Sequence, residues 1–220
     1  MRQALTRIGF CFIAALAEGC TATTYRPYDQ RESAASPFER RVYAHVAPEM
    51  AQDMPRCVMI VPADPGLEHG IASRVSGSLR RHLADRFERV IGSEETERAA
   101  GRMAYDGAGE QEQRALAAGI ACGSLLRWRI LDGSGRFAVI LADQRFGLEI
   151  ELVRARDGLA LWQASHLGNR WAGGAPLSWL ALPMAVAQAA QLHHDDDGFA
   201  SLIEDVVRRM TATLSVVASK

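Results

Sequence analysis

The sequence contains almost no lysine and no excess of charge of either sign. Its 220 residues hold 25 Lys and Arg against 26 Asp and Glu, which gives a formal net charge of −1. Lys220 is the single lysine, so nearly all of the positive charge is arginine. Proteins that bind nucleic acid usually gather basic side chains on one face or along one helix. We therefore expect no nucleic-acid partner.

Recognisable catalytic, cofactor and metal motifs are also missing. The Gly-x-Gly pairs at 107–109 and 133–135 lack the strand–loop–helix setting of a phosphate-binding loop. The cluster from His193 to Asp197 offers imidazole and carboxylate groups, but adjacent ligands on one short loop rarely close a metal site. Its acids suit the positive end of the helix that follows. We expect no enzyme activity, no cofactor and no metal.

Apolar runs long enough to cross a membrane are absent. The nearest is Leu177 to Leu192, which Ser178, Pro183 and two glutamines interrupt. The run Ile8 to Ala17 is clean apart from one glycine, but as a helix it would span only about 15 Å, half of a bilayer core. Two arginines and no acid precede that run, and this pattern is typical of a secretory signal.

The short apolar run leads into the stretch Leu16-Ala17-Glu18-Gly19-Cys20. Ala17, Gly19 and Cys20 resemble the −3, −1 and +1 positions of the lipobox of bacterial lipoproteins. Glu18 departs from that pattern, because the −2 position normally holds a small uncharged residue. The resemblance implies a signal peptide over residues 1–19 and a lipidated Cys20. Ordinary secretion, with a plain thiol at Cys20, is the alternative.

Thr21 occupies the position where an aspartate would imply retention in the inner membrane, so the resemblance points to the outer membrane. Residues 20–50 then form the lipidated cysteine and a tether, because Thr21 to Ser36 is polar and lacks an apolar period. Phe38 to Met50 is either a short helix or an extended arm. Residues 51–220 have the length of one domain with a sizeable core.

Two cysteines of this domain, Cys57 and Cys122, each open a predicted strand. In an oxidising compartment they can pair if the strands are neighbours. Cysteine is also among the most buried residue types. We favour two buried thiols and keep the disulfide as the alternative. Neither cysteine has a nearby histidine that would make it a nucleophile.

Apolar periodicity predicts an α/β fold in the order β-α-β-α-β-β-β-α, a single mixed-sheet sandwich. Its third, fourth and fifth strands form an antiparallel meander, and an amphipathic helix closes the chain. The run from Cys57 to Val61 has no alternation, which indicates a strand buried on both faces. The predicted strands are 57–61, 89–92, 120–131, 137–155 and 159–166, and the predicted helices are 71–91, 110–119 and 199–214.

The longest predicted strand changes phase along its length. Its apolar residues are odd-numbered up to Leu141 and even-numbered from Phe146 onward. One strand keeps both sets on one face only if an extra residue intervenes, so we predict a β-bulge within Ala142 to Arg145. We also predict a hairpin turn at Asp132 to Gly135, a tight turn at Arg156 to Gly158 and an irregular segment over 167–198.

Three features resemble one group of bacterial envelope lipoproteins. They are the strand Val58 to Pro62 followed by a long amphipathic helix, the strand pair whose turn leads into Asp157-Gly158-x-x-Leu161-Trp162, and the terminal helix after a loop. The group has a TolB-amino-domain-like or CsgG-like α/β fold. It includes curli-secretion lipoproteins, penicillin-binding-protein activator lipoproteins and PelC-type lipoproteins of exopolysaccharide export.

The resemblance implies a non-catalytic body on the periplasmic side of the outer membrane. It would be an accessory or structural subunit of an export or assembly system, with protein partners and either one copy or a ring of copies. The exopolysaccharide type is favoured, because the CsgG type needs a long membrane hairpin. The alternative function is a periplasmic regulator that activates a cell-wall synthase.

Five residues are candidates for partner contacts. Asp143, His166 and Arg170 lie near the predicted bulge and the end of the meander, where a bulge can re-aim side chains. Trp171 and Trp179 lie in the predicted irregular segment, where aromatic faces suit an interface. Asp143 and His166 are also the groups that a hydrolase or metal enzyme would use, which is a third hypothesis. Surface salt bridges are the structural alternative for the polar three.

Overall fold

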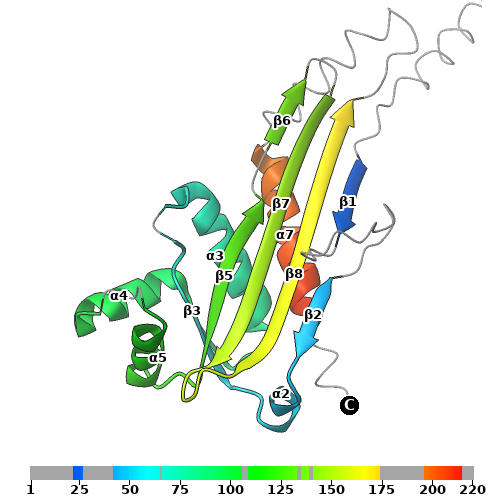
Figure 1. The fold of residues 1–220 in the computed structure, drawn as a ribbon. Coiled ribbons are helices and arrows are strands. Elements are labelled where there is room, and N and C mark those ends of the chain that lie inside the picture. The colour runs from blue at the N-terminus through cyan, green and yellow to red at the C-terminus, as the bar shows by residue number, and fades with distance from the viewer. Residues whose placement is uncertain are drawn as a thin grey trace, which may run out of the picture.

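The computed structural model describes residues 22–26, 42–64, 66–105, 109–132, 135–138, 141–173 and 196–214. Within these ranges it is a mixed α/β structure with one twisted sheet and five helices (Figure 1). The sheet order is β1-β8-β7-β5-β3-β4, with β2 added along β8 and β6 added along β7. The strands are β1 (Ala22–Arg26), β2 (Tyr43–Val46), β3 (Cys57–Ile60), β4 (Arg89–Ile91), β5 (Ser124–Asp132), β6 (Gly135–Ala138), β7 (Leu141–Arg154) and β8 (Ala160–Gly173).

The sheet is parallel at one side and antiparallel at the other. β3 pairs in parallel with β4 and with β5, while β7 and β8 run antiparallel to their neighbours. The helices are α2 (Pro48–Gln52), α3 (His69–Ala84), α4 (Ser93–Met103), α5 (Glu110–Gly119) and α7 (Asp196–Ala212). The mixed α/β class is confirmed, but β1, β2, α2, α4 and β6 add to the predicted element order.

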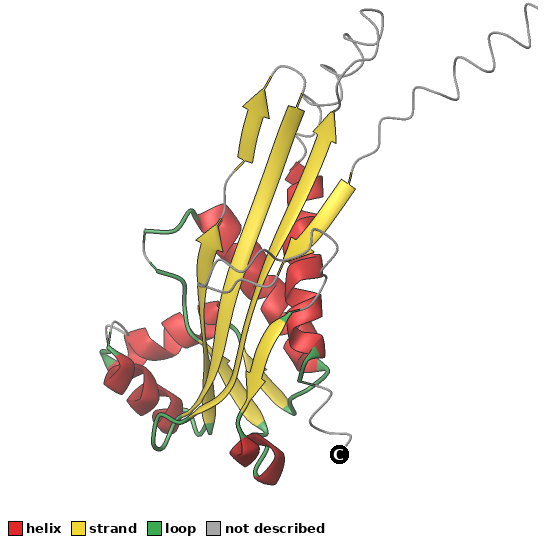
Figure 2. Cartoon of the chain, turned by 45° about the vertical axis from the view of Figure 1, so that its right-hand side comes forward, coloured by secondary structure: helices red, strands yellow, loops and turns green. Residues whose placement is uncertain are grey.

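The strand β3 is buried on both faces, as its continuous apolar sequence predicts. Val58 and Ile60 belong to a large core that includes residues of α3 and α7. Cys57 and Met59 belong to a second core that includes residues of α4 and α5. Because successive strand residues belong to opposite faces, β3 needs helices on both sides of the sheet. Figure 2 shows these helical layers on either side of the strands.

The two long amphipathic helices were predicted from their apolar spacing, and the structure confirms both. In α3, Val75, Leu79 and Leu83 recur every four residues and are fully buried. In α7 a stripe of apolar residues packs into the same core; its buried members are Leu202, Ile203, Val206, Val207 and Met210. The predicted first helix was too long, because α3 ends at Ala84 and Ile91 lies in β4.

The predicted bulge within Ala142 to Arg145 is wrong. The pairing of β7 with β8 is continuous through those residues, and its register shifts instead between Leu152 and Val153. The change of phase has another cause: the chain reverses between Ala138 and Leu141, which are cross-strand partners. Residues on either side of a reversal belong to different strands, so their odd and even positions need not share a phase.

The predicted hairpin turn at Asp132 to Gly135 is also wrong. Asp132 is the partner of Gly147 and Gly135 is the partner of Gln144, so β5 and β6 follow one another along the same edge of β7. The chain therefore does not form a hairpin between Asp132 and Gly135. The even-numbered apolar residues of β7 are nevertheless on one face, as predicted; Phe146, Leu148, Ile150 and Leu152 are all fully buried.

The strand β8 and the N-terminal segment also differ from the prediction. β8 runs for 14 residues to Gly173, so 167–173 is strand rather than irregular segment. The tether prediction is wrong for Ala22 to Arg26, because this segment is β1 and pairs antiparallel with β8. Backbone pairing with an edge strand gave no signal in the apolar pattern. Residues 38–50 contain both an extended strand, β2, and the short helix α2.

Candidate functional site

The long strands bring three of the candidate residues to one end of the sheet. Asp143 is the cross-strand partner of Trp171, and Arg170 is the partner of the next residue, Gln144. Trp171 is in turn the partner of Ala22, the first residue of β1. Trp171 therefore lies in a regular strand and not in an irregular loop. The structure thus gathers Asp143, Arg170 and Trp171 where the N-terminal strand joins the sheet.

His166 lies away from this end of the sheet. Its partner is Leu148, five positions along β8 from Trp171, which corresponds to about 17 Å of strand. The side chain is fully buried and belongs to the same face of β8 as Trp162 and Ala164 of the large core. A hydrolase that used Asp143 and His166 together would need the two groups within hydrogen-bond reach. The described structure does not bring them together.

Arg170 has a structural role. Its guanidinium Nη1 donates a hydrogen bond of 2.7 Å to the carbonyl oxygen of Gly198, in the first turn of α7. The Phe146 ring contacts the Phe199 ring edge-to-face nearby, with centroids 6.0 Å apart. These two contacts fasten the start of α7 to the sheet. The sequence predicts Arg170 as an interface residue and contains no signal for its partner on α7.

Three of the sequence candidates lie outside the described residues. They are Cys20, Trp179 and most of the cluster from His193 to Asp197, of which only Asp196 and Asp197 belong to α7. Among the residues that are described, no group of three or more His, Cys, Asp and Glu could hold a metal ion. In the same part of the chain, no helix has both the length and the apolar character that a membrane crossing requires.

Cys57 and Cys122 form a disulfide, in place of the two buried thiols that the sequence favoured. The bond joins the start of β3 to the segment just before β5, and these strands are parallel neighbours. The Ser124 hydroxyl donates a hydrogen bond of 2.7 Å to the Cys57 carbonyl oxygen and ties the same two segments. Both cysteines are buried, so the pair crosslinks the body of the protein and offers no reactive thiol.

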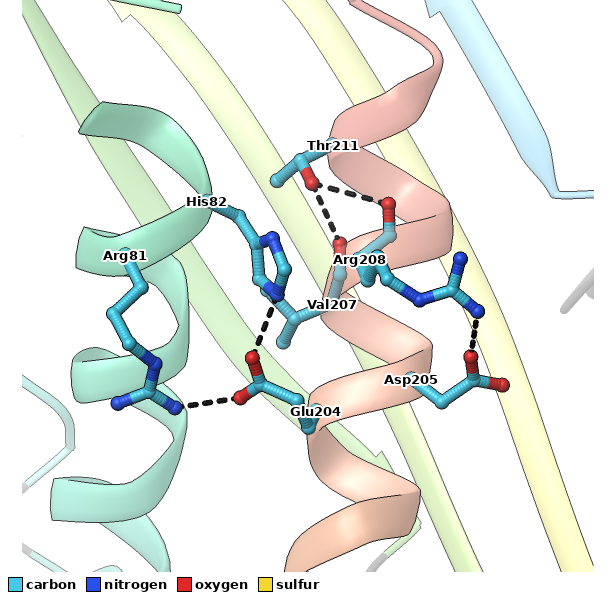
Figure 3. Close-up of polar contacts among 7 residues, drawn as sticks. All are labelled: Arg81, His82, Glu204, Asp205, Val207, Arg208 and Thr211. Atoms are coloured by element: carbon cyan, nitrogen blue, oxygen red, sulfur yellow. Dashed lines mark hydrogen bonds and ion pairs between the residues drawn. The ribbon is translucent and has the colours of Figure 1, made fainter. Parts of the chain in front are cut away.

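A polar contact on the surface joins α3 to α7 (Figure 3). The carboxylate of Glu204 lies between two side chains of α3: Arg81 Nη2 is 2.6 Å from Oε2, and His82 Nε2 is 2.8 Å from Oε1. Burial by itself would raise the pKa of Glu204, but the polar groups of Ser78, Arg81 and His82 together outweigh burial and lower that pKa. The apolar pattern of the sequence gives no signal for the contact of Glu204 with Arg81 and His82, because the partners are more than 120 residues apart.

Other acids on α7 and on the sheet are also paired. Figure 3 shows Asp205 beside Arg208 on α7, and the other oxygen of Asp205 accepts a 2.8 Å bond from Arg209. On the face of the sheet where α5 contacts β5, Arg127 and Arg129 of β5 lie opposite Glu151 and Glu149 of β7 and form ion pairs with them. Ion pairs with arginines hold these carboxylates in fixed positions on the surface. Such pairing suits a rigid surface and does not suit proton transfer.

The predicted tight turn at Arg156 to Gly158 is confirmed between β7 and β8. Asp157 accepts hydrogen bonds from Arg154, the shortest being 2.6 Å, and this contact lowers the pKa of Asp157 to about 2. Gly158 has φ +78°, a left-handed conformation that favours glycine. A Cβ at that position would lie 3.0 Å from the end of the flexible Arg114 side chain, which can move aside, so the backbone conformation is what favours glycine. The turn closes the end of the sheet opposite to Trp171.

No protein-family model and no curated protein matches the sequence. Several solved structures resemble its fold. The PelC dodecamer from Paraburkholderia phytofirmans matches with 17% identity over 78% of this chain and 97% of that chain, with a TM-score of 0.41. Lipoprotein GNA1162 from Neisseria meningitidis matches with 15% identity over 60% of this chain and 94% of that chain, with a TM-score of 0.45.

The C-terminal domain of LpoB from Salmonella enterica matches with 15% identity, over 53% of this chain and 87% of that chain, with a TM-score of 0.35. These values describe a resemblance of fold at low sequence identity. They carry no conclusion about activity or partner, which must come from the residues of this chain.

Proposed function

We propose that this chain is a lipid-anchored, non-catalytic accessory or structural subunit of an envelope export or assembly system. It is held at Cys20 on the periplasmic face of the outer membrane. The observation that carries the proposal is the stretch Leu16 to Cys20 after a short apolar run with a basic start. The three acyl chains of a mature bacterial lipoprotein would hold such a body in the bilayer effectively permanently.

The place of β1 supports an anchoring role. Ala22 lies two residues after Cys20 and already pairs with the long strand β8. A lipid at Cys20 would therefore attach almost directly to the main sheet, with no long tether between them. Such a connection fixes the height and tilt of the body above the membrane, which suits a structural subunit more than a freely diffusing enzyme.

The chemistry of the body supports a role without catalysis. Within the described residues, the candidate pair Asp143 and His166 is separated, and the surface acids Glu149 and Asp205 are paired with arginines. The buried disulfide between Cys57 and Cys122 suits an oxidising compartment such as the periplasm. The favoured system is exopolysaccharide export rather than a CsgG-type channel, because the strands that follow Phe137 include residues of the large core, such as Phe146 and Trp162.

The proposal is tested by purifying the full-length protein from envelope membranes in mild detergent and identifying its assembly state and partners. An accessory subunit of an export system should run as a large homo-oligomer or co-purify with export proteins. Co-purification of a monomer with a cell-wall synthase would favour the regulator instead. The Cys20→Ser variant is the matched control: it should leave the membrane fraction, and its retention there would contradict the anchor.

A further inference from the structure

The proposed mature chain contains three cysteines, and their sulfur atoms have two different fates. Cys11 belongs to the predicted signal peptide, so Cys20, Cys57 and Cys122 remain. Cys57 and Cys122 form the disulfide of the body, while the proposed lipid needs the sulfur of Cys20 as its point of attachment. The thiolate is the nucleophile of a cysteine, so a sulfur that has entered a disulfide cannot accept a lipid. The pairing of these cysteines therefore decides whether the chain acquires its anchor.

The fold keeps Cys20 away from the disulfide. Ala22, which follows Cys20 by two residues, is level with Asp143 of β7 in the pairing of the strands. The start of β3, with Cys57, lies beside the row of Arg154, eleven residues further along β7 and about 36 Å away. Figure 1 shows β1 and the turn between β7 and β8 toward opposite ends of the long strands. A disulfide needs Cα atoms within about 7 Å of each other, so the folded body cannot contain a bond between Cys20 and Cys57.

The disulfide lies inside a core and has to form before that core closes. Cys57 is 9% exposed and Cys122 is 2% exposed, and both belong to the second core, with Ala99 of α4 and Leu116 of α5. Thiol oxidation by exchange requires direct attack between a thiolate and a sulfur of the oxidant's disulfide, so it requires access. An enzyme-sized oxidant cannot reach these sulfur atoms once α4 and α5 are packed. Oxidation therefore takes place on an open chain, in which Cys20 is accessible as well.

On an open chain a free Cys20 competes with Cys122 for Cys57. Cys20 precedes Cys57 by 37 residues, whereas Cys57 and Cys122 have a sequence separation of 65 residues. The entropy cost of closing a flexible loop rises with three halves of the logarithm of its length, so the shorter loop closes about twice as often. Export that begins at the N-terminus also delivers Cys20 and Cys57 before Cys122. A chain that is oxidised while the Cys20 thiol is free would therefore favour the wrong pair, which consumes both the anchor sulfur and one half of the native crosslink.

We propose that the lipid is attached to Cys20 before Cys57 and Cys122 are oxidised, so that lipidation directs the native disulfide. This inference rests on the proposed lipidation of Cys20. In the first step the Cys20 sulfur bonds to a glyceryl carbon of a phospholipid donor. The bond from that carbon to the phosphate oxygen breaks, the phosphate headgroup leaves with the electron pair, and the thiol proton goes to solvent.

The second step is the oxidation of the remaining pair. Cys57 and Cys122 together lose two protons and two electrons as their sulfur atoms bond, and a thiol oxidant that carries its own disulfide takes both electrons and becomes a dithiol. The thioether on Cys20 has no thiolate and cannot take part in this exchange. Cys57 then has a single partner left, which is Cys122.

The test compares three chains expressed in the same cells. The first is the wild type. In the second, residues 1–19 are exchanged for a secretory signal peptide that is cleaved before Cys20, so that the Cys20 thiol stays free. The third has the same exchange together with Cys20→Ser, and it is the matched control because it is equally unanchored but has no competing thiol. Free thiols are blocked with N-ethylmaleimide, and the disulfide-linked peptides are quantified by mass spectrometry without reduction. A pulse-labelled sample of the wild type is blocked at early times to capture the intermediate.

The wild type and the Cys20→Ser control should contain almost only the bond between Cys57 and Cys122. The chain with the free thiol should contain the bond between Cys20 and Cys57 at about twice the amount of the native bond. The early wild-type intermediate should carry lipid on Cys20 and maleimide on Cys57 and Cys122.

Two results would overturn the inference and leave the lipid anchor standing. One is complete native pairing in the chain with the free Cys20 thiol. The other is a wild-type intermediate that has the disulfide but no lipid. Mature wild-type protein with an unmodified Cys20 would instead refute the proposed function itself.

Discussion

Two segments of this chain have an unbroken apolar sequence, and the described structure surrounds them differently. The strand β3 is covered by helices on both sides, with Val58 and Ile60 in one core and Cys57 and Met59 in the other. The second segment is the run Phe137 to Ala142 at the end of the β6–β7 hairpin, which we call the hairpin end; the strands that carry it extend past the described helices. The comparison teaches that an unbroken apolar run predicts burial only where the fold supplies a layer on each face, as it does for β3.

The strand β7 differs from β3, because it is apolar on one face and polar on the other. The even-numbered side chains of β7 lie in the core under α7, while Glu149 and Glu151 on the other face pair with arginines of β5. Within the described body, β3 is therefore apolar on both faces and β7 is apolar on one. The predictions below test whether stability is concentrated in the helix-covered body and is low at the hairpin end.

The largest effect is expected from the crosslink in the body. Replacing both Cys57 and Cys122 by alanine removes a disulfide that closes a loop with a sequence separation of 65 residues. The loop entropy of the unfolded chain then predicts a loss of about 4 kcal/mol in the free energy of unfolding. Urea unfolding followed by tryptophan fluorescence measures it. A loss below about 1 kcal/mol would mean that the body does not depend on the crosslink.

The same substitution at two positions of β7 compares the regions directly. Leu148→Ala leaves a cavity in the large core, where the side chain is fully buried, and should cost about 3 kcal/mol. Leu141→Ala at the hairpin end should change the free energy of unfolding by no more than about 0.5 kcal/mol in detergent solution. Equal losses at the two positions would show that the hairpin end is packed as tightly as the body.

A smaller effect is expected at the contact between α3 and α7. Glu204→Gln removes the ion pairs with Arg81 and His82 on a partly exposed surface, where screening limits the loss to about 0.5 kcal/mol at pH 7. The folded pKa of Glu204 is lowered, so its contribution is present above the ordinary glutamate pKa of about 4.3 and disappears as the pH falls through the folded value. The two proteins should therefore converge in acid. A difference that persists below pH 3 would mean that the carboxylate charge is not responsible.

The smallest effect is expected at the turn between β7 and β8. The pKa of Asp157 is lowered to about 2 by its hydrogen bond with Arg154, so its contribution is present above about pH 4 and is lost as the pH falls toward 2. In the Asp157→Asn variant, the unfolding midpoint should change less with pH between about pH 4 and pH 2 than in the wild type. At pH 7 the midpoints of the two proteins should be nearly equal. A two-dimensional NMR titration of the wild-type carboxyl group checks the pKa itself, and an ordinary aspartate value would contradict the assignment.

Apolar periodicity predicted the parts of the fold that the chain covers with its own helices. The stripe of α3, the stripe of α7, the double-sided burial of β3 and the even-numbered face of β7 all follow from side chains that must leave water. α5 was predicted with the bounds that the structure gives it. The burial of each of these elements is visible in its own apolar spacing, so the local sequence pattern is enough to predict it.

The missed features depend on partners that are distant in the sequence. The strand β1 has a mostly polar sequence, Ala-Thr-Thr-Tyr-Arg, and pairs with β8, so no apolar period marks it. The change of phase near Leu141 was interpreted as a bulge within one strand, although a chain reversal explains it equally well. The contact of Glu204 with Arg81 and His82, and that of Arg170 with Gly198, join segments whose proximity only the fold creates.

The central claim is that a lipid on Cys20 holds this sheet at a membrane, and the mass of the mature N-terminal peptide tests it most directly. Intact-mass and fragment-ion spectrometry of the protein from envelope membranes should show a first residue of Cys20 carrying a diacylglyceryl group and an amide-linked acyl chain. An N-terminal peptide that starts elsewhere, or that carries an unmodified thiol at Cys20, would contradict the account.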